Sequence, residues 1–231
     1  MLHTKNLYNT QNRPTANQKG RKLALDTSAI ILAGGLSARF RQDKGLLLLA
    51  GKPLIKHVLD GVGNITNEKL VVTSSETQAE AYTKALGSNV KVFVDRGNLH
   101  SPLAGALTGF EKATGAYSIL LPCDTPLVSR EIVSLLLDLS VNKTAVIPRW
   151  PNCYIEPLQA VYHTGSVLEA SMEALQEGNM TMQSMVSKLL GVRYVSTLVL
   201  QQLDPELNTF LNVNSPLDLK KAENLLKRRR K

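Results

Sequence analysis

The sequence has 231 residues, 43% of them hydrophobic and 20% charged, which is typical of one globular domain rather than two. The net charge of +8 is uneven, because residues 1–26 and 220–231 hold 12 of the 27 Lys and Arg residues and only two of the 19 acids. This terminal excess predicts solvated tails, with weak contact to a polyanion as the alternative. With only 5% aromatic residues, the composition argues against a nucleic-acid-binding surface.

Two cysteines, Cys123 and Cys153, and four scattered histidines lack the spacing of a zinc site or a disulfide framework. We expect both thiols to be reduced and buried. The N-terminal segment has no apolar signal-peptide core, and no apolar run approaches the ~18 residues of a membrane span. These features predict a cytoplasmic protein without a membrane segment.

The elements are predicted from the alternation of strand-length apolar runs with amphipathic stretches of helical length. Residues 1–22 are polar and aperiodic, which predicts a flexible basic tail; the domain spans 23–226, and 227–231 form a second basic tail. Strands are expected at 23–33, 69–74, 90–95, 117–124, 144–149, 157–163 and 192–200. Helices are expected at 53–63, 76–86, 102–114, 129–139, 164–177, 181–190 and from residue 215.

This alternation is typical of β-α-β units on a mostly parallel sheet, and it predicts a Rossmann-like, three-layer α/β/α fold. In such sheets ligands bind beyond the carboxyl ends of the strands. The loop after the first strand and the loop at Asp124 should therefore meet in one crevice.

A glycine pair after the first strand predicts a phosphate-binding loop. Without Cβ atoms, Gly34 and Gly35 let the backbone amides approach a triphosphate closely, although a bare turn requires the same residues. Arg39 and Lys44 add positive charge where pyrophosphate would leave. The loop is neither a Walker A motif nor a GxGxxG motif, which argues against a kinase or a dehydrogenase. The predicted nucleotide-binding residues of this segment are Leu32, Ala33, Gly34, Gly35 and Lys44.

The segment LAGGLSARFRQDKGLLLLAGKPLIKHV resembles the signature loop of the molybdenum cofactor guanylyltransferases, LAGGxSxRMGxDKxLLxxxGxPLxxxV. PLAG at 102–105, PCDTPL at 122–127, EPLQAVY at 156–162 and FLNVNSPLDL at 210–219 continue the match in the family's order. The resemblance covers nearly all of residues 23–226. The family's Met-Gly after the arginine is replaced by Phe40-Arg41, which removes a permissive backbone position.

The resemblance implies transfer of GMP from GTP to the terminal phosphate of molybdenum-molybdopterin, forming the guanine dinucleotide cofactor and pyrophosphate. It implies Mg²⁺ as cofactor, a molybdopterin-type acceptor, and molybdoenzymes or cofactor-delivery proteins as partners. Gly34 favours GTP, because cytidylyl relatives more often have LAAG. A cytidylyltransferase, a sugar-phosphate nucleotidyltransferase, or a nucleotide-binding protein weakened by Phe40-Arg41 are the alternatives.

Asp124 follows a buried strand and is our candidate Mg²⁺ ligand, since Mg²⁺ takes one or two carboxylates together with phosphate oxygens. By the resemblance it is the family's metal-binding position. Capping of the following helix is the alternative. Because the attacking phosphate is already an anion, no general base is needed, and the predicted catalytic residues are Arg39, Lys44 and Asp124.

Two further positions are predicted at the nucleotide. The resemblance places Asp95 at guanine, whose N1 and N2 donors suit a carboxylate, and Asn214 beside the nucleotide or its metal. A turn-forming role for Asp95 and helix capping near residue 215 by Asn214 are the alternatives. The small residues of 102–105 can expose amides to an anion or permit close helix packing.

The resemblance also places three residues on the acceptor side: Glu156, Gln159 and Tyr162.

Overall fold

The computed structural model describes residues 25–34, 36–37, 42–95 and 101–229. The predicted N-terminal tail, Gly35, Arg39 and the Phe40-Arg41 substitution lie outside these ranges. Within them, no helix combines the length and apolar character needed to cross a membrane.

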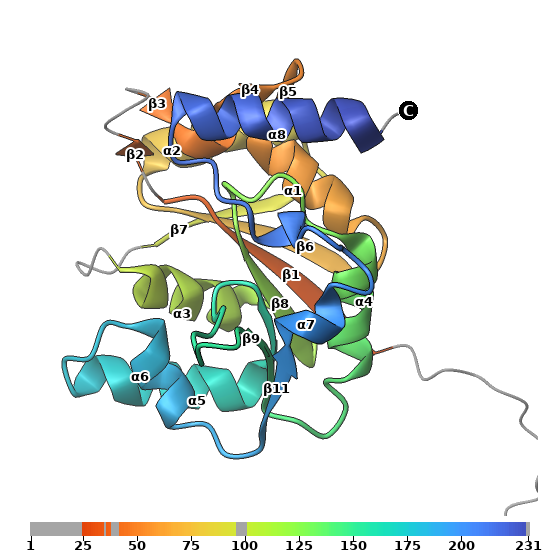
Figure 1. Cartoon of the computed structure of the whole chain (residues 1–231). Helices are drawn as coiled ribbons and strands as arrows, with labels where there is room; N and C mark the ends of the chain where they lie inside the picture. Colours follow the sequence, from red (N-terminus) through yellow and green to blue (C-terminus); the bar gives the residue numbers. More distant parts are fainter. Residues whose placement is uncertain (1–24, 35, 38–41, 96–100, 230–231) are drawn as a thin grey trace, which may run out of the picture.

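A seven-stranded sheet forms the centre of the molecule, in the order β11-β9-β10-β8-β1-β6-β7 (Figure 1). Its pairings are parallel except those of β10, which runs antiparallel to both β8 and β9. The mostly parallel α/β fold is therefore confirmed. The strands are β1 (Thr27–Leu32), β6 (Glu68–Thr73), β7 (Lys91–Val94), β8 (Tyr117–Pro122), β9 (Ala145–Arg149), β10 (Ala160–His163) and β11 (Val192–Ser196).

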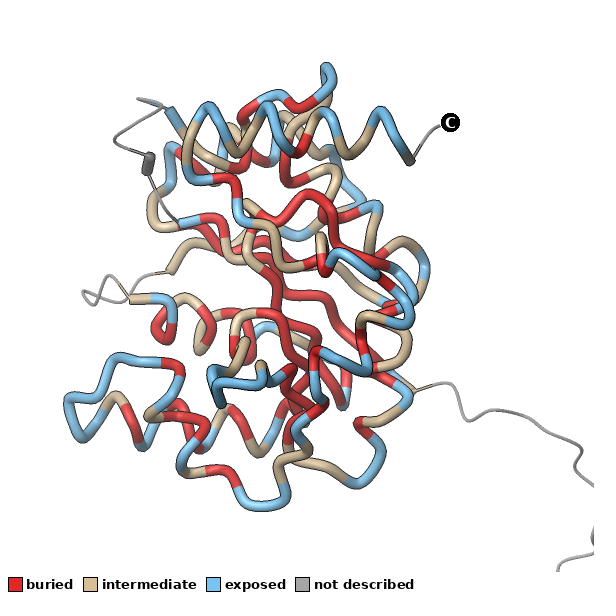
Figure 2. Tube along the Cα trace, viewed as in Figure 1, coloured by how far each residue is buried: buried red, intermediate tan, exposed pale blue. Residues whose placement is uncertain are grey.

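Helices cover both faces of the sheet, because successive side chains of a strand point to opposite faces. Ala29 and Ile31 of β1 pack in one core with α1 (Leu54–Val62), α2 (Glu76–Leu86) and α4 (Arg130–Asp138), whereas Ile30 packs in a second core. The second core holds α3 (Pro102–Lys112), α5 (Thr164–Gln176) and α6 (Met182–Ser187). Figure 2 shows the buried residues concentrated along the central strands.

Short elements between β1 and α1 form a separate subassembly. β2 (Leu36–Ser37) pairs with β3 (Gln42–Asp43), η1 (Lys44–Leu46) follows, and β4 (Leu48–Leu49) pairs with β5 (Lys52–Pro53). The C-terminal helix α8 (Pro216–Arg229) packs on this region through a small apolar cluster. That cluster consists of Leu47, Leu49, Leu54, Leu127, Val213 and Ala222. The helix continues through 227–229, which belong to the segment interpreted as a basic tail.

The strand expected at 192–200 is only partly correct. β11 ends at Ser196, whose Oγ accepts a hydrogen bond from the Leu198 amide and caps α7 (Thr197–Leu200). Thr197 and Leu200 are buried on one side of this short helix, while Leu198 is exposed. Period alone does not separate a strand from a helix in a short apolar run, which explains the error.

A polar cluster lies at the amino ends of the strands. The Glu68 carboxylate accepts hydrogen bonds from the Ser28 hydroxyl (2.6 Å), the Thr114 amide (2.5 Å) and the Lys91 ammonium (3.1 Å). Burial alone would raise the pKa of Glu68, but these bonds stabilise the ionised form and lower the pKa to about 2. This cluster therefore ties β1, β6 and the end of α3 together.

Helix α3 is placed tightly against the sheet. A Cβ on Gly109 would lie 2.4 Å from Cγ2 of Ile30, so only glycine allows this approach. Ser101 caps the helix by accepting a hydrogen bond from the Ala104 amide at 3.1 Å, and proline follows at the first helical position. The amino end of α3 is thereby held at the carboxyl edge of the sheet.

Candidate active site

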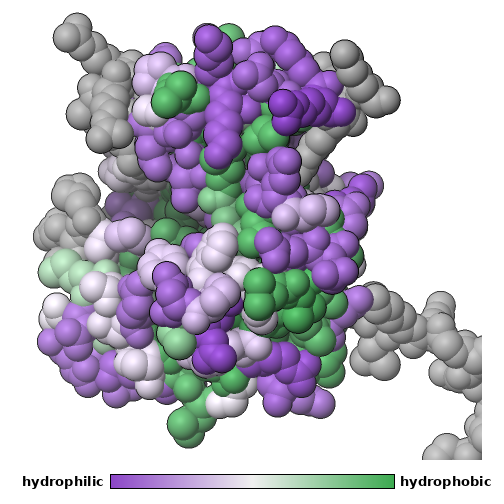
Figure 3. Space-filling model, in the orientation of Figure 1, coloured by the Kyte–Doolittle hydropathy of each residue, from purple (hydrophilic) through white to green (hydrophobic). Residues whose placement is uncertain are grey.

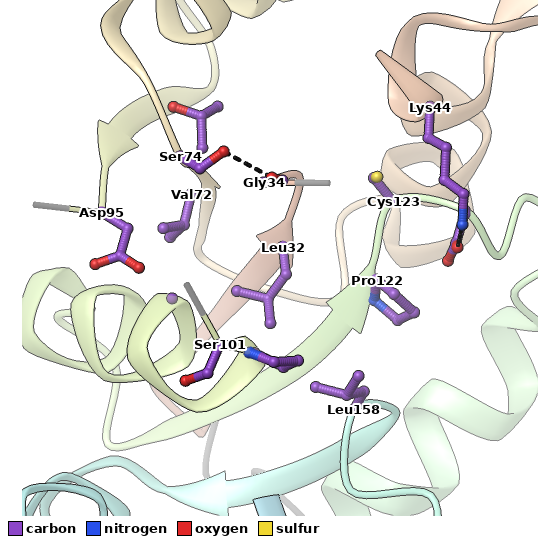
Figure 4. A pocket seen from close by; sticks show the side chains of 14 residues that line it. Leu32, Gly34, Lys44, Val72, Ser74, Asp95, Ser101, Pro122, Cys123 and Leu158 are labelled. Carbon is purple, nitrogen blue, oxygen red and sulfur yellow. Dashed lines mark hydrogen bonds and ion pairs between the residues drawn. The ribbon is translucent and has the colours of Figure 1, made fainter. Parts of the chain in front are cut away.

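A cavity of about 360 Å³ opens at the carboxyl ends of β1, β6, β7 and β8, beside the start of α3 (Figure 4). The surface is hollowed between the part that carries α8 and the part that carries α3 (Figure 3). The first loop and the Asp124 loop meet here, as the fold rule predicts. The lining residues are Leu32, Gly34, Lys44, Val72, Thr73, Ser74, Asp95, Ser101, Pro102, Gly105, Pro122, Cys123, Asp124 and Leu158.

Lys44 lies at the centre of a three-residue contact at one side of the cavity. Its Nζ donates to Asp124 Oδ2 at 2.8 Å and to Asn214 Oδ1 at 2.5 Å. The Lys44 and Asp124 side chains are 20% and 15% exposed, so the pair is shielded while one side remains reachable. Three predicted residues from distant parts of the chain are thus brought together.

Backbone contacts hold this group in place. Lys44 begins η1, which is capped by Asp43. Asp124 lies two residues beyond the end of β8, after Cys123. The amide of Val213 donates to the Asp124 carbonyl at 2.8 Å, which fixes the segment before α8 against the end of β8. The conformation of Asp124 therefore depends on the C-terminal segment.

The capping roles considered for Asp124 and Asn214 belong to other residues. Ser129 caps α4, accepting from the Ile132 amide at 3.3 Å. Ser215 caps the first turn of α8, accepting from the Asp218 amide at 3.3 Å. The side chains of Asp124 and Asn214 both contact Lys44 instead.

Asp95 lies at the other side of the cavity, at the end of β7. Its amide donates to the Thr73 carbonyl at 2.7 Å, and its Oδ1 accepts from the Thr108 hydroxyl of α3 at 3.1 Å. A Cβ added to Gly105 would lie 3.9 Å from Asp95 Oδ2 and 3.7 Å from Leu32, which is ordinary contact. The glycine at this position therefore widens the cavity beside Asp95, and close helix packing does not require it.

Two of the remaining predicted residues lie differently from what the sequence suggested. Ala33 is buried in the core, and its amide donates to the Val72 carbonyl at 2.7 Å, so its side chain and N–H face away from the cavity. Tyr162 is completely buried, stacks edge-on against Phe110, and donates to the Pro157 carbonyl at 2.6 Å. Both residues support the fold behind the site.

The acceptor-side block contributes one lining residue, Leu158. Gln159 is buried. Glu156 accepts a hydrogen bond from the Trp150 indole at 2.7 Å, and burial raises the pKa of its carboxyl group. The block therefore forms a wall next to the cavity, although most of its polar side chains bond within the protein.

The cysteines differ from each other. Cys123 is buried, and burial together with the neighbouring Asp124 raises the pKa of its thiol, so it remains a protonated filler. Cys153 is exposed, and the expectation that it is buried was wrong. It occupies a left-handed backbone position, with φ of 67°, in the turn after β9.

Several cavity residues were not assigned a role from the sequence, among them Ser74 and Ser101. Ser74 follows β6, the neighbour of β1, and its hydroxyl donates to the Gly34 carbonyl at 2.6 Å. The rule that ligands bind beyond the carboxyl ends of strands points to Ser74. The Ser-Pro pair before a predicted helix indicates that Ser101 caps α3, whose amino end faces the cavity.

Comparison with known proteins identifies the family. The sequence model of one protein family, the MobA-like NTP transferase domain, matches residues 29–192, which include Gly34 and Asp124. The chain belongs to this family.

Curated relatives and solved structures agree with this assignment. The chain is 31% identical over 197 residues to a probable molybdenum cofactor guanylyltransferase of Methanothermobacter thermautotrophicus, covering 84% of this chain and 97% of the relative. A probable molybdenum cofactor guanylyltransferase of Bacillus cereus is 30% identical over 202 residues, covering 85% and 95%.

Among solved structures, molybdopterin-guanine dinucleotide biosynthesis protein A from Archaeoglobus fulgidus aligns with a TM-score of 0.74 and 26% identity, covering 87% of this chain and 99% of that one. The 2-C-methyl-D-erythritol 4-phosphate cytidylyltransferase of Thermus thermophilus shares the fold, with a TM-score of 0.66 at 18% identity, covering 88% and 100%.

Proposed function

We propose that this chain transfers GMP from GTP to the terminal phosphate of a molybdopterin-type acceptor and releases pyrophosphate. The observation that carries the proposal is the convergence of Lys44, Asp124 and Asn214 beside a cavity that Gly34 and Asp95 also line. The names of the relatives supply the guanylyl and molybdopterin parts of the proposal.

The donor set around Lys44 fits a divalent cation. A carboxylate oxygen of Asp124 and an amide oxygen of Asn214 converge on the Lys44 ammonium group. These two oxygens would hold a metal ion once Lys44 turns from them toward a phosphate. Among the described residues, no three His, Cys, Asp or Glu side chains form a metal cage. Mg²⁺ suits such a site, because it is usually held by one or two protein oxygens together with phosphates and waters. Bound there, it would neutralise charge on the phosphates during transfer.

Other residues of the site have proposed roles in binding GTP. We propose that the Asp95 carboxylate, which lines the cavity, accepts hydrogen bonds from guanine, and that the backbone at Gly34, which also lines it, approaches phosphate. Lys44 supplies positive charge for the departing pyrophosphate.

An acceptor phosphate oxygen attacks the α-phosphorus, and the bond from that phosphorus to the β-phosphate bridging oxygen breaks. Because the nucleophile is an anion, the chain's task is alignment and charge neutralisation.

Pyrophosphate release from each of the four nucleoside triphosphates, with Mg²⁺ and purified molybdopterin, tests the proposal. We expect release to be greatest with GTP and to require the acceptor. Equal or greater release with CTP would reject the guanylyl assignment. Tight GTP binding without any release would support a nucleotide-binding protein instead.

A further inference from the structure

A second polar network lies behind the cavity, between β3 and α2. The Asp43 carboxylate accepts hydrogen bonds from three donors: the Tyr82 hydroxyl and the Gly45 amide (3.1 Å) at Oδ1, and the Gln78 amide Nε2 (2.7 Å) at Oδ2. Gln78 and Tyr82 are one helical turn apart, so both project from one face of α2. Asp43 directly precedes Lys44 in the chain.

Gln78 extends the network to the other side. Its Oε1 accepts from the Ser74 amide at 3.0 Å and lies 2.8 Å from the Ser74 hydroxyl. That hydroxyl in turn donates to the Gly34 carbonyl at 2.6 Å, as the dashed line in Figure 4 shows. The network therefore joins Gly34, at the start of the phosphate loop, to Lys44, at its end.

The orientation of Gln78 is determined by its neighbours. An amide N–H of Ser74 can only donate and an ionised Asp43 can only accept, so the Gln78 oxygen must face Ser74 and its nitrogen must face Asp43. Gln78 is 8% exposed and Tyr82 is fully buried, which makes an unsatisfied group costly. The Gln78 amide thus has one orientation that satisfies its bonds to both the Ser74 amide and the Asp43 carboxylate.

The packing around Asp43 allows little displacement. A Cβ on Gly45 would lie 2.2 Å from the Tyr82 hydroxyl oxygen, so the approach of Tyr82 depends on glycine at this position. Burial raises the pKa of the Asp43 carboxyl, and the bonds from Tyr82, Gln78 and the Gly45 amide oppose that effect. These contacts hold the peptide from Asp43 to Gly45, and with it the base of the Lys44 side chain.

We propose that Asp43, Gln78 and Ser74 are positioning residues that hold Gly34 and Lys44 at the spacing required by a bound triphosphate. The inference rests on the proposed nucleotide site, because Gly34 and Lys44, which the network holds, line that cavity together with Ser74. A displacement of about 1 Å in such contacts can cost ~10²-fold in rate, so a network outside the reacting atoms can control turnover.

A polarity swap tests the proposal. In Asp43→Asn the new Nδ2 faces Gln78 Nε2, and in Gln78→Glu two carboxylates face each other, so each single variant loses a bond. The double variant Asp43→Asn/Gln78→Glu restores all of them, because the amide introduced at position 43 donates to the carboxylate introduced at position 78, which still accepts from Ser74. Net charge is the same in the double variant and the wild type. Ser74→Ala, which removes only the hydroxyl, gives an independent test of the link to Gly34.

The readouts are kcat/KM for GTP in pyrophosphate release, Kd for GTP with Mg²⁺ by calorimetry, and Tm. We expect each single substitution at Asp43 or Gln78 to lower kcat/KM by ~10- to 100-fold, and the double variant to recover to within about 3-fold of the wild type. Ser74→Ala should lower it by ~5- to 10-fold. Assays run well below the lowest Tm ensure that every variant is folded.

Val167→Ala, in the core on the opposite face of the sheet, is the control for general destabilisation. It should lower Tm while leaving kcat/KM unchanged. Single variants that lower Tm but keep normal kcat/KM and Kd would overturn the proposal, as would a double variant no better than the worse single one. If the wild type binds GTP but releases no pyrophosphate, the proposed reaction fails while the Kd series still tests the network. If it binds no nucleoside triphosphate, both proposals fail.

Discussion

Replacing Lys44 by alanine separates the catalytic role of this residue from its structural role. In the structure its ammonium is shared between Asp124 at 2.8 Å and Asn214 at 2.5 Å, and its side chain is 20% exposed. Because water reaches the pair, we expect loss of the ion pair to lower the free energy of unfolding by only about 1 kcal/mol.

The expected effect on turnover is larger. A preorganised positive group facing developing charge is worth about 3 kcal/mol, which corresponds to a fall of at least ~10²-fold in kcat. Lys44→Arg should recover only part of the loss, since a planar guanidinium cannot occupy the position of a compact ammonium between two oxygens.

The assay is pyrophosphate release from GTP with Mg²⁺ and molybdopterin, with unfolding by denaturant measured in parallel. Lys91→Ala is a matched control, because it also removes a lysine from an ion pair, with Glu68 at 3.1 Å, at the opposite edge of the sheet. The control should keep normal turnover. A Lys44→Ala protein with turnover near that of the wild type would show that the Lys44 ammonium does not act in turnover.

Three further outcomes are expected. Asp124→Asn keeps an oxygen for Lys44 but removes the charge, so kcat should fall at least ~10²-fold and a Mg²⁺ titration should require more metal; an unchanged titration would remove Asp124 as the ligand. Asp95→Ala should lower the ratio of kcat/KM for GTP to that for CTP by ~10-fold, since a hydrogen bond to a charged group is worth about 1.5–3 kcal/mol, and an unchanged ratio would place guanine selection elsewhere. The pKa of Glu68 is lowered from 4.5 to about 2, so its stabilisation is present above pH 4.5 and is lost as the pH falls toward 2. Denaturant unfolding at pH 6 and pH 2.5 should show Glu68→Gln losing about 2 kcal/mol less than the wild type on acidification, and equal losses would contradict this account.

The local pattern of apolar and polar residues was sufficient to predict most of the helices and strands. The apolar runs of β1 and β8 and the amphipathic periods of α1 and α4 depend on residues close in the chain, so the sequence predicts them directly. Such patterns do not distinguish a short helix from the end of a strand, and α7 was therefore missed. They also do not contain the direction of a strand, and β10 proves to be antiparallel.

The site divides in the same way. Asp124 and Gly34 were predicted because, in this fold class, ligands bind beyond the carboxyl ends of the strands, where both residues lie. Both line the cavity. The contact of Lys44 with Asn214 joins residues 170 positions apart, and the bond from Gln78 to Asp43 joins α2 to β3, 35 residues earlier. Short-range periodicity sets the elements, so the residues at each strand end can be predicted from the sequence. Contacts between side chains depend on how the layers pack, and they are therefore seen only in the folded molecule.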